Sequence, residues 1–138
     1  MLDLSTQFGQ RVNRQIKSEI VVWLTTVDRD NIPQPRPVWF YWDGTTFLIY
    51  SQPKAHKVRH IVRAENVALH FSSDSKAHEV TVLTGKAQVD RNAPAADRHP
   101  GYLSKYREAI AGIGMQPSEM AKEYSVAIRV KPTRLRGF

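Results

Sequence analysis

Apolar residues recur at helical spacing in four segments of the chain. The first is residues 4–18, where Ser5 can cap the helix and the apolar stripe consists of Leu4, Phe8, Val12 and Ile16. Residues 55–64 predict a second helix, with an apolar stripe of Val58, Ile61 and Val62. Residues 100–111, which are followed by two glycines that can close a helix, and residues 117–122 predict two more.

Runs of β-branched and aromatic residues predict six strands between and after these helices. The predicted strands are residues 20–27, 38–42, 47–51, 66–72, 79–91 and 125–130. The first of them (IVVWLTTV) is apolar at successive positions, so we expect both of its faces to be buried. Gly85 is a candidate bulge in the longest strand. A basic tail, residues 131–138, follows the last one.

Prolines and a short turn define the middle of the chain. Pro33, Pro35 and Pro37 occupy every second position before the second strand. Because proline lacks the amide that donates in a sheet, this extended segment is expected at a sheet edge or bulge. Asp43-Gly44 then separates two apolar runs, which is a strong signal for a β-hairpin.

The order of these elements predicts a mainly β protein with peripheral helices, of the α+β class. The length suits one domain, residues 1–138. Several strands are apolar on both faces, which favours a small, closed, six-stranded antiparallel barrel with a covered outer face. A second copy of the chain in a dimer would cover that face.

Composition and charge restrict the class of partner. The chain carries 20 Lys and Arg against 13 Asp and Glu, a net charge of +7, and has no cysteine. Disulfides and thiolate metal sites are excluded, and the charge favours nucleic acid, phosphates or a polyanionic cofactor. No recognition helix or RNA-binding signature is present, so nucleic acid is the less favoured partner. No stretch reaches the about 18 apolar residues of a membrane span, and the first residues lack a signal-peptide core, so we expect a cytoplasmic protein.

Five cationic or titratable residues gather around the start of the predicted helix 55–64: Lys54, His56, Lys57, Arg59 and His60. The free amides and positive dipole of the helix start, with Lys54, Lys57 and the hydroxyl of Ser51, could hold a phosphate. The alternative interpretation is a solvated basic helix face. The two flanking strands would offer a flat surface, so a ligand with a planar ring and a phosphate tail could use both features.

No motif indicates chemistry by the chain's own side chains. His56 and His60 have the i, i+4 spacing of zinc ligands, but Lys57 stands where the HExxH pattern has glutamate, so no metal is expected. Glycine-rich dinucleotide loops, nucleophile elbows and paired carboxylates are missing. If the protein is an enzyme, its chemistry is expected to come from a bound cofactor. Tyr41 and Tyr50 are the only candidates for a general acid, and no catalytic residue is assigned.

The order "apolar strand, turn, PRPVWF, Asp-Gly, strand, polar break, lysine, NVAL" resembles the split β-barrel flavoproteins related to pyridoxamine 5′-phosphate oxidase. The resemblance covers nearly the whole chain and is densest over residues 20–71. The flavin/deazaflavin oxidoreductases are the most similar branch, and the ending IRVKPTRLRGF is also similar to theirs. The chain departs from the pyridoxamine oxidases in its shorter length, in Ala55-His56 where they usually have Ser-Arg, and in the missing C-terminal arginine and histidine pattern.

The resemblance implies a homodimer with cofactor sites at the subunit interface. The backbone that faces the cofactor ring in this family maps to Pro37, Val38 and Trp39. The phosphate contacts map to Ser51, Lys54 and Lys57, with Arg59 and His60 nearby. Arg136 and Phe138 of the partner's tail could complete the site.

Three functions remain open on this basis. The leading hypothesis is an oxidoreductase in which a bound deazaflavin, coenzyme F420, transfers a hydride to an electron-poor small molecule. The acidic tail of this coenzyme agrees with the net charge of +7. The second is an FMN-binding flavin reductase or a protein like pyridoxamine-phosphate oxidase. The third is a non-catalytic carrier of flavin or haem.

Overall fold

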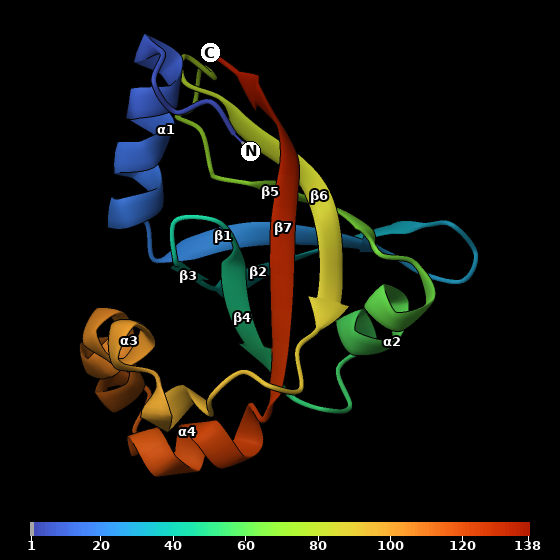
Figure 1. The fold of residues 1–138 in the computed structure, drawn as a ribbon, viewed down its shortest axis with the longest axis vertical. Helices are drawn as coiled ribbons and strands as arrows, with labels where there is room; N and C mark the ends of the chain where they lie inside the picture. Colours follow the sequence, from blue (N-terminus) through green and yellow to red (C-terminus); the bar gives the residue numbers. More distant parts are fainter. Residues whose placement is uncertain (1) are drawn as a thin grey trace.

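The computed structural model describes residues 2–138, whose centre is one antiparallel sheet with the strand order β2-β1-β5-β6-β7-β4-β3 (Figure 1). The strands are β1 (Val21–Val27), β2 (Pro33–Trp39), β3 (Tyr41–Trp42), β4 (Phe47–Ser51), β5 (Asn66–His70), β6 (Thr81–Val89) and β7 (Val126–Gly137). The helices are α1 (Gln7–Ser18), α2 (His56–Arg63), the 3₁₀ turn η1 (Ala96–Arg98), α3 (Pro100–Gly112) and α4 (Pro117–Glu123). The α+β class and the curled, split-barrel sheet agree with the sequence prediction. The expected closure is wrong, because the edge strands β2 and β3 are not paired with each other and the sheet forms only a half-barrel.

The sheet curls because one residue connects its two edges. β2 forms one edge by pairing with β1, and β3 forms the other by pairing with β4. Only Phe40 lies between β2 and β3, so the chain passes from one edge to the other within a single residue. The prediction of six strands was wrong here. The expected strand 38–42 is divided at Phe40 because its two parts pair with different neighbours, which gives seven strands.

Burial along β1 alternates strictly. Val22, Leu24 and Thr26 are buried, whereas the residues between them are only half-buried and Val21 is exposed. The expectation that both faces of residues 20–27 are buried is therefore wrong for a single copy of the chain. The five residues of β4, in contrast, are all buried.

β7 is longer than predicted. The expected strand 125–130 and the expected basic tail form one strand that pairs with β4 and, over a longer stretch, with β6. The register shifts between Thr84 and Gly85, so the predicted bulge position is confirmed. The additional residue, Thr133, lies in β7, because Gly85 pairs with Pro132 and Thr84 with Arg134.

The helix starts and faces differ in detail from the prediction. α1 begins at Gln7 with Thr6 as its cap, whose hydroxyl accepts from the Gly9 amide at 2.9 Å. Ser5 does not cap it, because the amide and hydroxyl of Ser5 both donate to Asp3. In α2 the predicted stripe residue Val62 is 74% exposed. No helix within residues 2–138 is long and apolar enough to span a membrane.

Gly85→Ala should destabilise the protein. A Cβ at this position would overlap the carbonyl oxygen of Lys131 and lie 2.8 Å from Pro132 Cα, both backbone atoms of β7. We expect the free energy of unfolding to fall by about 1–3 kcal/mol, measured by urea unfolding.

Gly112→Ala is the matched control. Nothing lies within 4 Å of a Cβ at Gly112, the last residue of α3, so this variant should be as stable as the wild type or slightly more stable. If Gly85→Ala were as stable as Gly112→Ala, this result would contradict the close approach of the β6 and β7 backbones at Gly85.

Candidate functional site

Two cavities meet at Lys57 in the first turn of α2. The larger, of about 750 Å³, lies between the β1–β2 hairpin and α2 and is called the cationic cavity. It is lined by Thr26, Asp28, Arg29, Asp30, Gln34, Arg36, Ala55, His56, Lys57, Arg59, His60 and Arg63. The smaller, of about 400 Å³, lies between the edge of β2 and the helices α3 and α4 and is called the aromatic cavity. It is lined by Val21, Pro37, Val38, Trp39, Tyr50, Lys57, Tyr102, Ile113, Met120 and Tyr124.

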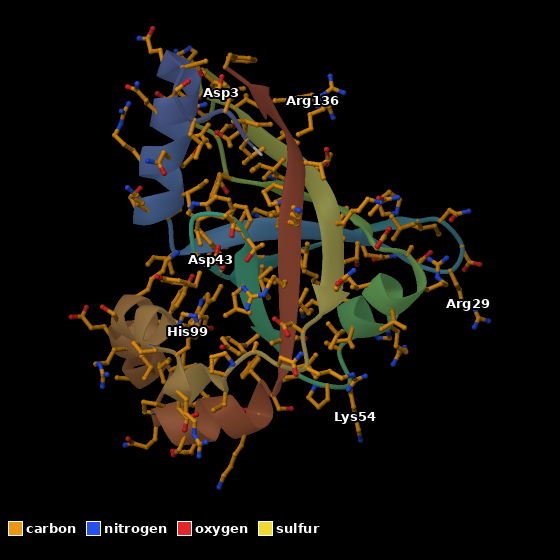
Figure 2. The ribbon with its side chains drawn as sticks, viewed as in Figure 1. Asp3, Arg29, Asp43, Lys54, His99 and Arg136 are labelled. Atoms are coloured by element: carbon orange, nitrogen blue, oxygen red, sulfur yellow. The ribbon has the colours of Figure 1, made fainter. Side chains whose placement is uncertain are left out.

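The alternation of β2 directs its polar residues toward α2. Gln34 pairs with Thr26 and Arg36 pairs with Leu24, so these side chains share the inner face of the sheet. The three prolines at the intervening positions take the opposite face. As a result, the hairpin and α2 provide the two walls of the cationic cavity. Figure 2 shows Arg29 at the hairpin tip, on the same side of the molecule as α2.

Five Lys and Arg side chains line the cationic cavity, namely Arg29, Arg36, Lys57, Arg59 and Arg63. None of the five forms an ion pair with a carboxylate anywhere in residues 2–138. Two carboxylates also line the cavity, at Asp28 and Asp30. The cavity therefore has a net positive charge that side chains of this chain do not neutralise.

The Asp28 carboxylate bonds to groups of the hairpin and does not pair with the cations of the cavity. Its carboxylate accepts hydrogen bonds from the Ile32 and Asp30 amides, each at 2.9 Å, and from the Gln34 side chain at 3.0 Å. The bond from the Ile32 amide is the main cause that lowers the pKa of Asp28. The carboxylate stays ionised and holds the turn that follows β1.

Arg63 connects α2 to the same hairpin. Its Nη2 donates to the Val27 carbonyl oxygen at 2.9 Å and to the Asp28 carbonyl oxygen. In the preceding turn of α2, Arg59 Nη2 lies 2.6 Å from His56 Nδ1. These contacts fix the cavity wall without using a carboxylate, so the guanidinium charges remain available to an anion.

Burial disfavours charge on two groups near the cavity floor. His60 Nδ1 lies 2.8 Å from the hydroxyl of Thr26, which is buried. Burial lowers the pKa of His60, and Asp28 opposes this effect. Burial, followed by the nearby Arg36 guanidinium, also lowers the pKa of Lys57. A bound anion that pairs with both Lys57 and Arg36 would raise the pKa of Lys57 again.

The aromatic cavity is bounded by stacked rings. Trp39 stacks on Tyr106, with ring centroids 4.8 Å apart and planes 9° apart. Tyr50 lines the cavity, but its hydroxyl donates to the Pro94 carbonyl at 2.7 Å, and burial raises its pKa to about 12. Its proton is therefore poorly placed for transfer. Tyr41, the other candidate acid, lines neither cavity.

The structure brings together six of the eight sequence-predicted site residues. Pro37, Val38 and Trp39 line the aromatic cavity, Arg59 and His60 line the cationic cavity, and Lys57 lines both. Cofactor binding by these residues stays a prediction.

The two other predicted residues lie apart from the cavities. Ser51 is buried at the end of β4, and its hydroxyl donates to the Gln52 carbonyl at 3.0 Å. Lys54 is exposed in the turn before α2 (Figure 2). Arg136 lies near the end of β7 (Figure 2). Phe138 follows this strand, and Arg11 of α1 donates to its carbonyl oxygen at 2.8 Å. Neither residue lines a cavity described above, so any contribution to the site would be to that of another copy of the chain.

Sequence reasoning missed many of the lining residues, including Arg29 and Arg63 of the cationic cavity, and two further groups show why. The first is Gln34 and Arg36, which the alternation with the prolines could have indicated. The second is on α3 and α4 and the segment between them, at Tyr102, Ile113, Met120 and Tyr124. No local signal could have found these, because their helical spacing only predicts packing. No cluster of three or more metal-ligating side chains occurs in residues 2–138.

The sequence matches one protein family over nearly its whole length. The family model for pyridoxamine 5′-phosphate oxidase matches residues 8–138. No curated protein sequence matches the chain.

Solved structures share the fold at low sequence identity. One is a candidate pyridoxamine 5′-phosphate oxidase from Listeria innocua (TM-score 0.68, 21% identity, covering 94% of this chain and 96% of that one). Another is HutZ, the haem storage protein of Vibrio cholerae (TM-score 0.68, 11% identity, 96% and 95% covered). A third is an F420 reductase (TM-score 0.66, 21% identity, 90% and 94% covered). These likenesses show the shared fold, and the family match over residues 8–138 shows that the chain belongs to the pyridoxamine 5′-phosphate oxidase family.

Proposed function

We propose that this protein is an oxidoreductase that binds the deazaflavin coenzyme F420 and reduces an electron-poor small molecule. The observation that carries the proposal is the junction of the aromatic and cationic cavities at Lys57. The aromatic cavity suits a planar ring, and the cationic cavity suits an acidic tail. An F420 reductase has the same fold, which agrees with the proposal.

The size and charge of the cationic cavity favour F420 over FMN. A single phosphate occupies a small part of about 750 Å³, and one or two cations are enough to hold it. Here five cations without carboxylate partners line the space. An acidic tail with several charges would use most of them. FMN remains the alternative, with its phosphate at Lys57.

The chain's own residues would bind and orient the ligand. The backbone of Pro37, Val38 and Trp39 would lie along the ring, and Lys57 would hold the phosphate where ring and tail join. When bound, the deazaflavin would supply the hydride. The apolar wall from α3 and α4, at Ile113 and Met120, would limit access of water to the ring. Within residues 2–138, no side chain is placed to act as the acid, so a proton would come from solvent.

We also propose that the protein forms a homodimer. The far edge of β2 has no strand partner in residues 2–138. On the outer face of the sheet, the rings of Trp23 and His70 stack with centroids 6.1 Å apart and remain partly exposed. Val21, on the same face of β1 as Trp23, is 37% exposed. A second copy of the chain would cover this apolar surface and complete the barrel's exterior.

Parallel titrations would test the cofactor. Ligand-free protein would be titrated with F420, FMN and haem, followed by fluorescence or absorbance. We expect the tightest binding for F420, weakened by salt because several ion pairs form. Preference for FMN would move the protein to the flavin-dependent enzymes, and preference for haem would favour a carrier. Binding of none of the three would refute the proposal.

Lys57→Ala should reduce the affinity for the preferred cofactor. The variant removes a charge-assisted contact worth about 1.5–3 kcal/mol. We therefore expect the dissociation constant to rise by about tenfold or more. Lys54→Ala removes the same charge from an exposed position that lines neither cavity, so its affinity should change little. Equal losses in both variants would point to unspecific electrostatics rather than to a phosphate contact at Lys57.

Trp23→Glu should produce a monomer, because it places a charge in the proposed dimer surface. Analytical ultracentrifugation would show a wild-type mass near twice the chain mass of 15.8 kDa and a variant mass near the chain mass. Lys122→Glu, on the exposed side of α4, is the control and should stay dimeric. A monomeric wild type would exclude the homodimer.

A further inference from the structure

Phe40 has backbone groups that the sheet does not pair. Its neighbours Trp39 and Tyr41 pair with β1 and β4 respectively, but Phe40 itself has no partner strand. Its side chain is fully buried, so its amide and carbonyl are remote from bulk water. Buried backbone groups without a partner are costly, so other donors and acceptors must serve them.

Two consecutive residues of α3 supply these partners. The hydroxyl of Tyr106 accepts from the Phe40 amide at 2.7 Å, and Lys105 Nζ donates to the Phe40 carbonyl at 2.9 Å. The same ammonium lies 3.5 Å from the centroid of the Phe40 ring. We call these contacts the seam clamp, because they hold the residue at which the two sheet edges meet.

The two side chains of the seam clamp depend on each other. The single proton of the Tyr106 hydroxyl can go to the Ile20 carbonyl at 2.7 Å or to the Phe40 carbonyl at 2.8 Å. Because Lys105 already donates to the Phe40 carbonyl, the Tyr106 hydroxyl can donate to the Ile20 carbonyl. Without Lys105, one of the two carbonyls would lose its donor.

The seam clamp also reaches the aromatic cavity, although neither of its side chains lines that cavity. Trp39, which lines the cavity, directly precedes Phe40 and stacks on the ring of Tyr106. Movement of Phe40 would therefore shift Trp39 and the rest of β2. Lys105 lines a different cavity, between α1, β3 and α3.

We propose that Lys105 and Tyr106 are positioning residues that hold Trp39 and the end of β2 where a ring bound in the aromatic cavity requires them. For the identity of that ring, the inference rests on the proposed function. The positioning itself can be measured on the ligand-free protein, so the two can fail separately.

Protonation of Lys105 should influence the seam clamp. Burial lowers the pKa of Lys105 to about 8, and Glu19 opposes this effect. Lys17 and Tyr41 line the same cavity, and Tyr106 lies beside the ammonium. Opening of the clamp would expose the amine and return its pKa toward 10.5, so the open state binds more protons between these values. Raising the pH above 8 should therefore favour the closed clamp, since a neutral amine can still donate to Phe40.

The first experiment needs no ligand. In a background of Trp23→Phe and Trp42→Phe, Trp39 is the only tryptophan, and acrylamide quenching measures its exposure. Tyr106→Phe and Lys105→Met should each raise the quenching constant by about twofold or more, because the clamp opens more often. Lys122→Met, an exposed lysine on α4, is the control and should not change it. Far-UV circular dichroism would confirm that the variants are folded.

The pH dependence of Trp39 quenching distinguishes a positioning role of Lys105 from a general effect on stability. It can be measured in the protein with native Lys105, so it remains a test if a variant fails to fold. Between pH 7 and 9, quenching of Trp39 should decrease in the protein with native Lys105 and stay flat in Lys105→Met. In Tyr106→Phe, the Phe40 amide should also exchange about tenfold faster, because it has lost its acceptor.

The second experiment measures affinity for whichever cofactor binds the wild type. Each single variant should weaken binding by about fivefold or more, and the double variant should lose less than the product, because both act through Phe40. Unchanged quenching, or quenching that does not decrease with pH, would overturn the proposal. Unchanged affinity despite increased quenching would overturn it as well. If no cofactor binds the wild type but Trp39 responds as expected, the proposed function fails and the positioning stands.

Discussion

The fold depends on the passage of the chain through Phe40. One residue connects the two edge strands of a seven-stranded sheet, so the sheet must curl until these edges lie close together. Sheet pairing cannot satisfy a residue that belongs to neither strand, and a buried peptide group needs a partner. α3, which packs through Tyr102, Tyr106 and Ile110, meets this need with two side chains. The position of the helix in turn creates the aromatic cavity.

Electrostatics distinguish the two cavities. The aromatic cavity contains no ionised group except Lys57, whereas the cationic cavity gathers arginines from a hairpin and a helix that are remote in sequence. Like charges so close together raise the free energy of the folded chain unless an anion joins them. The lowered pKa of Lys57 reflects this, because burial and Arg36 both disfavour its charge. An anionic ligand would remove that cost, which links the charge pattern to binding.

Local chemistry was a good guide to the secondary-structure elements around the candidate site. The prolines before residue 38 correctly indicated an edge strand, since they cannot donate to a second neighbour. Asp43-Gly44 correctly indicated the hairpin, in which Gly44 has a φ of 101°. Ser51 and Lys54 were placed in the site from the family resemblance and from their sequence proximity to α2. The strand end buries the first and the turn exposes the second, which spacing in the sequence does not reveal.

The sequence by itself determined the class of fold, the edge strand, the hairpin and the cationic start of α2, because each follows from backbone preferences or charges of neighbouring residues. Only the tertiary structure decided that the chain changes sheet edge at Phe40 and that Lys105 and Tyr106 serve it from α3. It also decided that residues of α3 and α4 close the aromatic cavity. These features join segments more than 60 positions apart, as the contacts of Phe40 with α3 show. Their formation depends on burial and on the pairing of backbone groups, which local patterns do not encode.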